Sequence, residues 1–303
     1  MPKFESFIPQ TTADGSFTFI SEEFCEAFHS HFGAKQESFL KFVAPTQLAI
    51  SASKPSLKIL DICYGLGYNT AAALQIIWQI NPSCYVELIG LELNPVVPQA
   101  AIAHHLFDNW DYEYTTILSK LADEHQIETN RLQAKLLIGD ARSSIELVNQ
   151  LGFQADAIFL DPFSPPQCPH LWTIEFLQKV TQCLHLDGLL ATYSCAAAVR
   201  TALIAAGLQI GSTPPVGRRS PGTIAAHNKT AIDKLLILSQ QEQEHLLTRA
   251  AVPYRDPQLN NSASIILMRR QQEQQTSSLE PTSHWRKRWL LGNEDTHGVR
   301  TSS

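Results

Sequence analysis

A strand, a glycine turn and a helix follow one another near residue 60, and this pattern constrains the fold more than any other part of the chain. The apolar segment Leu57–Ile62 carries an acid near its end, Asp61, and the glycines Gly65 and Gly67 come next. Alanine-rich sequence typical of a helix runs from about Asn69 to Gln79. Glycines let the backbone approach a ligand closely, and the amino end of a helix favours polar or anionic groups. The pattern predicts an α/β domain with a ligand at this turn.

The turn argues against a dinucleotide cofactor. The last glycine of the dinucleotide fingerprint is missing, because the sequence continues as Gly67-Tyr68-Asn69-Thr70. An acid in the turn would repel a pyrophosphate, whereas it suits the positively charged methionine end of S-adenosylmethionine. From the turn alone, a methyltransferase and a plain strand–turn–helix of an α/β domain both remain open. The candidate cofactor contacts here are Asp61, Tyr64, Gly65, Gly67 and Asn69.

Composition narrows the class of protein. The chain has 303 residues, of which 44% are hydrophobic and 17% charged, as in an ordinary globular core. A net charge of −6 argues against a chain that is basic overall, but a local basic face would still bind RNA. The six cysteines show no paired spacing, and no apolar run approaches membrane-spanning length. We expect a soluble cytoplasmic protein with reduced cysteines, no metal site and no membrane partner.

Strand and helix patterns alternate through the middle of the chain, which predicts a doubly wound, mainly parallel sheet with helices on both faces. The expected strands are Leu57–Ile62, Tyr85–Glu92, Ala134–Asp140, Ala155–Asp161 and Gly188–Ser194. The expected helices are Asn69–Gln79, Pro95–Phe107, Ala141–Leu151, Leu171–Leu184 and Ala196–Ala206. Four of the strands end on an acid, namely Asp61, Glu92, Asp140 and Asp161. One such acid is often only a helix N-cap, but four at the carboxyl edge of one sheet predict a shared ligand crevice.

Three parts of the chain are expected. Residues 1–55 form a small amino-terminal lobe that covers the crevice, and residues 56–230 form a Rossmann-like domain. Within that domain the segment Leu208–Asn228 predicts a closing antiparallel hairpin, because prolines and a glycine separate its two apolar stretches. Residues 231–303 form a carboxyl-terminal extension with a strand at Leu235–Leu238, and its polar, low-complexity sequence predicts that it is largely mobile after residue 270.

Two of the strand-end acids have specific expected roles. Glu92 can accept two hydroxyl hydrogen bonds, which is how this architecture holds a ribose, although a helix cap is the alternative. Asp140 can accept a hydrogen bond from an adenine amino group. The neighbouring residues Leu93 and Ala141 are also candidate cofactor contacts. Arg142 is expected to anchor the following helix.

The segment Asp161–Trp172 is the second distinctive feature of the sequence. Four prolines surround an aromatic residue, so the loop is stiff, and it lies where the reacting group must arrive. Prolines cannot donate backbone hydrogen bonds, so the carbonyls of the prolines in this loop are expected to be free to accept from a substrate amine. Structural prolines alone would explain the stiffness but not the acid.

With these motifs in place, the chain resembles the methyltransferase of wobble-uridine tRNA modification, the MnmC-type family, in a stand-alone form without the flavin oxidase domain. The proline loop is the most specific part of a resemblance that covers roughly residues 15–230. Two residues of the turn, Cys63 and Tyr64, depart from the small residues that the family usually has. The matching segments are Asp61–Asn69, Gly139-Asp140, Asp161–Trp172, Thr192-Tyr193-Ser194, Val199-Arg200, Gly217-Arg218-Arg219 and, more loosely, Phe19–Gly33.

The resemblance implies an S-adenosylmethionine-dependent N-methyltransferase of Rossmann-like, class I fold. Its substrate would be the aminomethyl group of a modified wobble uridine, its partner tRNA, and a separate protein would supply the aminomethyl-uridine. Asp161 is the candidate that orients the amine and receives its proton.

Other residues are candidates for substrate contact. Phe163 and Trp172 would stack on a nucleobase, with packing against the following helix as the alternative for Trp172. Pro165 belongs to the same loop. Arg218 and Arg219 would bind phosphates, with a solvated hairpin tip as the alternative.

Two other classes of function remain open. An aminopropyltransferase shares the architecture and a run like Leu171-Trp172-Thr173, but it needs a second acid three residues after the strand-end Asp161, where Ser164 stands. A methyltransferase of another small amine would use the same fold. A non-catalytic cofactor-binding scaffold would bind the cofactor without passing a methyl group to any amine.

Overall fold

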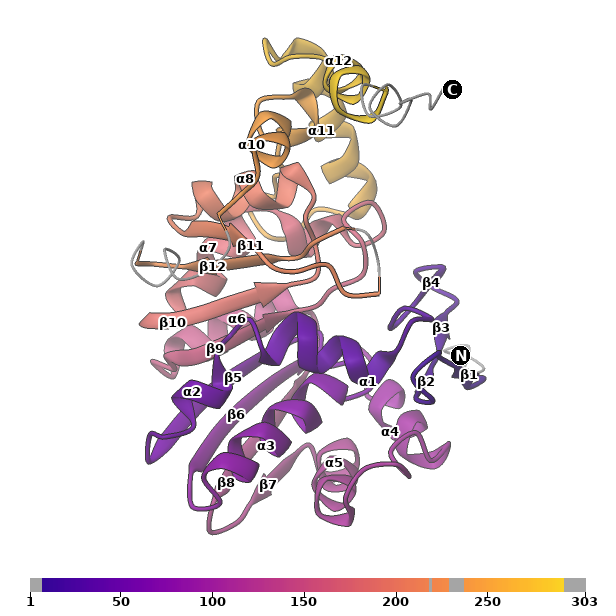
Figure 1. Cartoon of the computed structure of the whole chain (residues 1–303), viewed down its shortest axis with the longest axis vertical. Coiled ribbons are helices and arrows are strands. Elements are labelled where there is room, and N and C mark those ends of the chain that lie inside the picture. Colours follow the sequence, from indigo (N-terminus) through magenta and orange to yellow (C-terminus); the bar gives the residue numbers. More distant parts are fainter. Residues whose placement is uncertain (1–6, 218–219, 229–236, 292–303) are drawn as a thin grey trace, which may run out of the picture.

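The computed structural model describes residues 7–217, 220–228 and 237–291, and its centre is one large sheet (Figure 1). In the described residues the sheet has eight strands in the order β11-β12-β10-β9-β5-β6-β8-β7. The five parallel strands are β5 (Ser56–Ile62), β6 (Tyr85–Glu92), β8 (Leu132–Ile138), β9 (Ala155–Leu160) and β10 (Leu184–Thr192). The antiparallel ones are β7 (Gln126–Glu128), β11 (Gln209–Ser212) and β12 (Thr223–Ala226). The predicted doubly wound sheet and its closing hairpin are confirmed.

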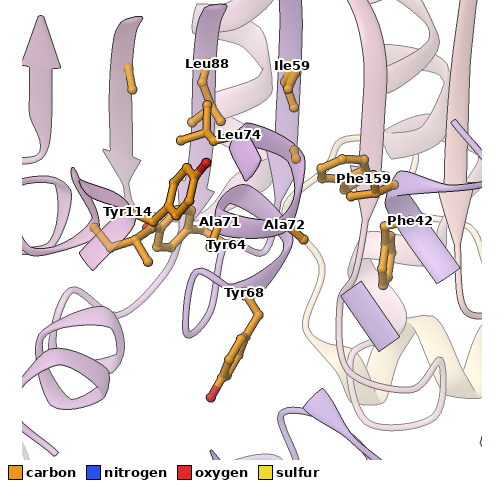
Figure 2. Close-up of a cluster of buried hydrophobic side chains, with 14 of the residues drawn as sticks. Phe42, Ile59, Tyr64, Tyr68, Ala71, Ala72, Leu74, Leu88, Tyr114 and Phe159 are labelled. Atoms are coloured by element: carbon orange, nitrogen blue, oxygen red, sulfur yellow. The ribbon is translucent and has the colours of Figure 1, made fainter. Parts of the chain in front are cut away.

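Helices cover both faces of the sheet. One face carries α3 (Tyr68–Ile80), α4 (Val96–Ala103) and α5 (Tyr112–Glu124), and the other carries α6 (Ala141–Gln150), α7 (Ile174–Gln182) and α8 (Ala197–Ala205). Successive residues of a strand alternate between the two faces, so Ile59 packs under α3 while Leu60 packs under α6 and α7. Figure 2 shows the first of these cores, where Leu88 of β6 meets Leu74 of α3 and Phe159 of β9 lies near Phe42, with ring centroids 5.9 Å apart. Burial on both faces explains the continuous apolar runs of the strands.

The strand order reverses between β5 and β9. From β5 the chain moves through β6 to β8 on one side, and then returns to β9 on the other side. In such sheets a ligand crevice opens outside the carboxyl ends of the strands at the switch point. Asp61 and Asp161 lie at these two strand ends, which places the predicted crevice between them.

The predicted amino-terminal lobe divides into two parts. Its strands form two short hairpins, β1 (Gln10–Thr11) with β2 (Phe17–Thr18), and β3 (Ile20–Ser21) with β4 (Glu26–Ala27). Its helical part consists of α1 (Ala34–Glu37), the π-helix η1 (Ser38–Val43) and α2 (Leu48–Ser51). Phe42 and Leu48 are buried in the same core as α3, so the helical part belongs to the main domain. The lobe is therefore not a separate body.

The carboxyl-terminal extension differs from its expectation. It contains α10 (Gln240–His245), η3 (Arg249–Ala251), α11 (Ala263–Thr276), α12 (Thr282–Arg286) and the π-helix η4 (Lys287–Leu291), whereas a largely mobile chain after residue 270 is predicted. Polar side chains of α11 are satisfied by backbone carbonyls, because Arg270 donates to Val252 and Ala250 and Gln274 donates to Arg249. Most of the predicted strand Leu235–Leu238 lies outside the described residues, and its last two residues are irregular.

Candidate active site

A cavity of about 510 Å³ lies at the carboxyl ends of the parallel strands. Its walls come from the β3–β4 hairpin, the π-helix η1, the glycine turn, the ends of β6 and β8, and the proline loop after β9. This volume is in the range of sites that bury a small molecule or cofactor. Sequence-distant segments therefore meet at the edge where the strand-end acids were expected to gather.

The glycine turn holds its shape through left-handed backbone conformations. Cys63, Gly65 and Gly67 have φ angles of 66°, 55° and 95°. A β-carbon on Gly67 would lie 2.7 Å from the Tyr64 hydroxyl, so only glycine fits there. Cys63 is not a glycine, and a left-handed conformation costs such a residue about 1–3 kcal/mol, which is typical of functional sites.

Glu92 fastens the glycine turn to the end of β6. Its Oε2 accepts a hydrogen bond from the Gly65 amide at 2.7 Å, and its Oε1 accepts one from the Asn94 amide at 2.8 Å. Burial raises the pKa of Glu92, while these amides act in the opposite direction. The carboxylate therefore lines the cavity in a fixed orientation, with lone pairs left for hydroxyl donors.

Asp161 lies at the carboxyl end of β9 and lines the cavity. The Asn69 side-chain amide donates to its Oδ2 at 2.9 Å, which orients the carboxyl group. Burial raises the pKa of Asp161 well above its usual range, whereas the Asn69 hydrogen bond and the Lys41 charge act in the opposite direction. Asp161 is thus an oriented carboxyl group with an increased affinity for a proton.

The proline loop corrects two predictions. Pro162 O accepts from the Tyr193 hydroxyl at 2.9 Å, so one of the proline carbonyls expected to be free is already used. Phe163 O accepts from the Trp172 indole at the same distance. The Trp172 side chain is completely buried, and the prediction that it stacks on a nucleobase is wrong. Its hydrophobic surface is needed to pack the loop against α7. Pro165 is also buried and does not line the cavity, whereas Phe163 does.

The β3–β4 hairpin supplies cavity residues that sequence reasoning missed. Phe24 stacks on Phe163 with ring centroids 4.5 Å apart, and Phe28 meets the same ring edge-on at 5.1 Å. Glu26 accepts hydrogen bonds from the backbone amide of Ser164 at 2.9 Å and from its hydroxyl group. No local pattern in the sequence could indicate these contacts, because the partners are about 140 residues apart.

The π-helix η1 contributes a second missed group. Lys41 and Glu37 form a buried ion pair with Nζ 2.6 Å from Oε1, and Ser30 donates to both oxygens of Glu37. Among the described residues that line the cavity, Lys41 is the one lysine or arginine, against six carboxylates. A lysine and a glutamate at i, i+4 are an ordinary helix-surface pair, so the sequence carried no signal that they face a cavity.

Asp140 and Ala141 also line the cavity, just after the end of β8. Asp140 is the N-cap of α6 and accepts from the Arg142 amide at 2.9 Å. Arg142 anchors its helix, as expected, and it also reaches the carboxyl-terminal extension. The predicted phosphate contacts Arg218 and Arg219 lie outside the described residues.

Comparisons with known proteins decide the family. A family model described as S-adenosyl-L-methionine-dependent methyltransferase matches residues 104–228. An uncharacterized protein of Methanocaldococcus jannaschii is 30% identical over 261 residues, which cover 84% of this chain and 69% of that protein. The crystal structure of MnmC2 from Aquifex aeolicus is 32% identical with a TM-score of 0.78, and the match covers 91% of this chain and 87% of that chain. The chain belongs to the MnmC family of methyltransferases.

Other members of the MnmC family are longer. The bifunctional protein MnmC of Aromatoleum aromaticum, named for tRNA 5-methylaminomethyl-2-thiouridine biosynthesis, is 31% identical over 216 residues. That match covers 67% of this chain and 32% of the bifunctional protein, so the chain spans about a third of its length. The family resemblance seen in the sequence is confirmed, and S-adenosylmethionine is the cofactor. No helix in the described ranges is long and apolar enough to cross a membrane.

Two buried oxygens just behind the cavity lining have no hydrogen-bond partner. Asp61 Oδ1 and Asn69 Oδ1 have no hydrogen-bond partner, although Asp61 Oδ2 accepts from the Thr70 hydroxyl at 2.8 Å. Burial raises the pKa of Asp61 to about 7, against the Thr70 hydrogen bond. Buried acceptors without donors are unfavourable unless a ligand satisfies them, and the ammonium group of a methionine end is a cationic donor. These MnmC residues therefore fit the positive end of S-adenosylmethionine.

The predicted cofactor contacts fall into two groups. Those that line the cavity are Tyr64, Gly65, Glu92, Leu93, Asp140 and Ala141. Those that lie behind the lining, in the turn and the first turn of α3, are Asp61, Gly67 and Asn69. The second group supports the cavity wall through hydrogen bonds and shape, and the individual contacts of both groups stay predictions.

Proposed function

We propose that this chain transfers a methyl group from S-adenosylmethionine to the aminomethyl group of a modified wobble uridine in tRNA. The observation that carries this proposal is the position of Asp161, an oriented carboxyl group at the switch point of the sheet that lines the cavity. In the described residues the cavity wall has six carboxylates and one lysine, and this charge suits a cationic amine better than an anionic acceptor.

Asp161 has the chemistry that an amine acceptor needs. An alkylamine has a pKa near that of lysine, about 10.4, so it is mostly protonated at neutral pH and must lose a proton before it can attack. Burial raises the pKa of Asp161, which makes its carboxylate a stronger proton acceptor. When bound, S-adenosylmethionine supplies the methyl group on its sulfonium. The chain must hold the acceptor nitrogen about 3–3.5 Å from that carbon.

Lys41 suits the negatively charged group of the cofactor, the carboxylate of its methionine end. The methionine end carries a carboxylate as well as an ammonium group, and a buried carboxylate needs a cationic donor. Lys41 has one of its three N–H groups on Glu37 and lines the cavity. We therefore assign Lys41 to the carboxylate and the Asp61 region to the ammonium group.

Aromatic rings in the wall of the cavity favour a nucleobase. Phe24, Phe28 and Phe163 form one cluster that lines the cavity, and unpaired RNA bases bind by stacking on such rings. The name of the bifunctional relatives, which refers to tRNA biosynthesis, points to the same substrate. Arg218 and Arg219 remain candidates for phosphate contacts, and a separate protein would supply the aminomethyl-uridine.

The decisive experiment is single-turnover methylation of tRNA that carries 5-aminomethyl-uridine, with nucleosides measured by mass spectrometry. Asp161→Asn keeps the size and polarity of the side chain but removes its charge, so the rate should fall by about 10²–10⁴. Cofactor affinity and melting temperature should change little. The matched control is Asp123→Asn, at an exposed position of α5, which should keep the wild-type rate.

Three outcomes would contradict the proposal. Methylation by Asp161→Asn within a few-fold of the wild-type rate would remove its role as proton acceptor. Wild-type protein that methylates a free alkylamine but not the tRNA would favour a small-amine methyltransferase. Transfer of an aminopropyl group from the decarboxylated cofactor would favour the aminopropyltransferase alternative.

A further inference from the structure

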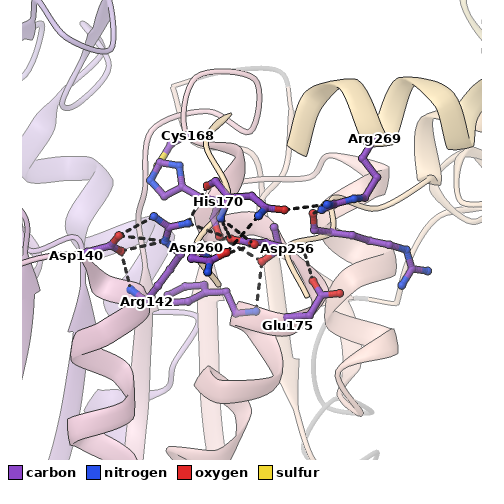
Figure 3. A network of polar contacts seen from close by, with 12 residues as sticks. Asp140, Arg142, Cys168, His170, Glu175, Asp256, Asn260 and Arg269 are labelled. Atoms are coloured by element: carbon purple, nitrogen blue, oxygen red, sulfur yellow. Dashed lines mark hydrogen bonds and ion pairs between the residues drawn. The ribbon is translucent and has the colours of Figure 1, made fainter. Parts of the chain in front are cut away.

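The Arg142 side chain connects the cofactor cavity to the carboxyl-terminal extension. Its Nε lies 3.2 and 3.1 Å from the two carboxylate oxygens of Asp140, and its Nη2 lies 2.7 Å from Oδ2. Its Nη1 donates to Asp256 Oδ2 and to Asn261 O, both at 2.9 Å. Figure 3 shows the guanidinium between the carboxylates of Asp140 and Asp256. One arginine thus holds a carboxylate of the cavity wall and a carboxylate of the extension.

Asp256 is a rigid partner for this arginine. Its side chain is completely buried, and its oxygens also accept from the backbone amides of Asn260 and Asn261. Its own amide donates to Glu175 Oε2 at 2.8 Å, which ties the segment to the start of α7. The neighbouring Tyr254 pairs with the chain just before α7. Asp256 therefore cannot move without disturbing the docking of the extension.

The charges around Asp140 favour its ionised form. Burial alone would raise the pKa of Asp140, but the side-chain and backbone hydrogen bonds from Arg142 outweigh burial and hold the pKa below its usual range. His170 faces the same carboxylate from the η2 helix (Pro169–Trp172), and burial and Arg142 lower the pKa of His170. Asp256 is the acid on the far side of the guanidinium. Arg142 is therefore the main cation that stabilises the Asp140 carboxylate.

A role limited to docking the extension does not account for the geometry. Arg142 donates to Asp140 through Nε and Nη2, and only its Nη1 donates to the extension. Two of its three nitrogens therefore bind a residue outside the extension. Arg269 and Arg270 already tie α11 to the rest of the extension without reaching the cavity. The bidentate grip on Asp140 has the geometry that orients a carboxylate.

We propose that Arg142 is a positioning residue for the cofactor and that Asp256 holds it in place, so that the carboxyl-terminal extension completes the adenine end of the cofactor cavity. This proposal rests on the predicted role of Asp140 as acceptor from the cofactor. Under this proposal Asp140 contacts the cofactor, Arg142 orients the Asp140 carboxylate, and Asp256 orients the Arg142 guanidinium. The extension then contributes to affinity although none of its residues lines the cavity in the described ranges.

The test measures binding of S-adenosylhomocysteine to the full chain by calorimetry, which needs no acceptor RNA. Arg142→Gln should weaken binding about tenfold at pH 7.5, since it removes a charge-assisted pair of hydrogen bonds. Asp256→Asn should also weaken binding, by a smaller factor than Arg142→Gln. Arg142→Lys should restore part of the affinity, because the charge returns without the bidentate geometry. Arg270→Gln is the matched control, since it loosens the extension at Val252 and Ala250 and has no hydrogen bond to Asp140, Arg142 or Asp256.

The pH dependence separates positioning from a merely structural role. Without Arg142 the pKa of Asp140 rises, so between pH 7.5 and 5.5 binding to Arg142→Gln should weaken by a larger factor than binding to the wild-type protein does. Unchanged affinity in a folded Arg142→Gln protein, or an equal loss in Arg270→Gln, would overturn the proposal. Unchanged affinity in Asp140→Ala would instead show that Asp140 does not contact the cofactor. None of these three results would bear on the proposed tRNA substrate.

Discussion

Asp61 is held in an unfavourable state in the absence of a ligand. Burial raises its pKa to about 7, and one of its oxygens has no partner. Because the folded-state pKa lies above the unfolded value, Asp61 favours the folded state at low pH and this contribution is lost as the pH rises through about 7. A residue that weakens the empty protein near neutral pH and suits a cationic ligand is typical of a binding site.

Cofactor binding should therefore release protons. At pH 7 about half of the Asp61 carboxyls are protonated in the empty protein, and a cationic group beside Asp61 lowers its pKa, so binding should release on the order of half a proton. Calorimetry of S-adenosylmethionine binding in two buffers with different ionisation enthalpies measures this number. Asp61→Asn should release clearly less. Proton uptake, or equal release by both proteins, would contradict the prediction.

At the scale of elements, the β3–β4 hairpin and the proline loop close over the cavity together. Ser164 donates twice to Glu26, and Phe163 stacks on Phe24. On its other side the loop is held by the Tyr193 hydroxyl through Pro162 O. The loop is thus stiff because of its prolines and also because it is fastened on both sides, which limits where an acceptor can enter.

Ser164→Ala should loosen this closure without unfolding the protein. The variant loses the hydroxyl bond to Glu26 but keeps the backbone bond, so hydrogen exchange should become faster in residues 20–30 while the melting temperature changes by a few degrees at most. Methylation of tRNA should slow, because the acceptor side of the cavity is less ordered. Ser53→Ala, at an exposed position, is the control. Unchanged exchange in residues 20–30 would mean that the hydroxyl bond does not hold the hairpin.

At the scale of the whole molecule, a buried arginine binds the extension to the closing hairpin. Arg200 of α8 is 2% exposed, donates to Thr223 and Gly222, and pairs with Glu242 of α10 at 2.8 Å. The Ser212 hydroxyl donates to the same glutamate oxygen. The extension is thus fixed to the main domain here as well as around Arg142 and Asp256.

Breaking the Arg200 pair should be costly. Glu242→Gln leaves a buried guanidinium without its counter-charge, and we expect a loss of about 3 kcal/mol in the free energy of unfolding, the lower end for a buried pair because Glu242 is partly exposed. Urea unfolding at pH 7 measures it. Glu146→Gln, which breaks the exposed pair with Lys179, should cost less than about 1 kcal/mol. Equal losses in the two variants would contradict a special role for Arg200.

Much of the main domain could be predicted because its signals are local. The apolar strand, the glycine turn and the alanine-rich helix around Asp61 match β5 and α3 within one residue at each end. The sequence analysis predicts no helix at α5, although Tyr114, Ile117, Leu118 and Leu121 have the spacing of a helix face. The composition of α11 could not predict that this segment is an ordered helix, because its polar side chains bind backbone carbonyls distant in sequence.

The amino-acid sequence by itself determined the alternation of strands and helices, the acids at the strand ends and the resemblance to the MnmC family. These features depend on periodicity and turn chemistry, which act over a few residues. Only the tertiary structure decided that Trp172 is buried, that Glu26 meets Ser164, that Lys41 faces the cavity and that Arg142 reaches Asp256. Each of these depends on contacts between segments far apart in the chain, and side-chain type and spacing do not specify which distant group lies opposite.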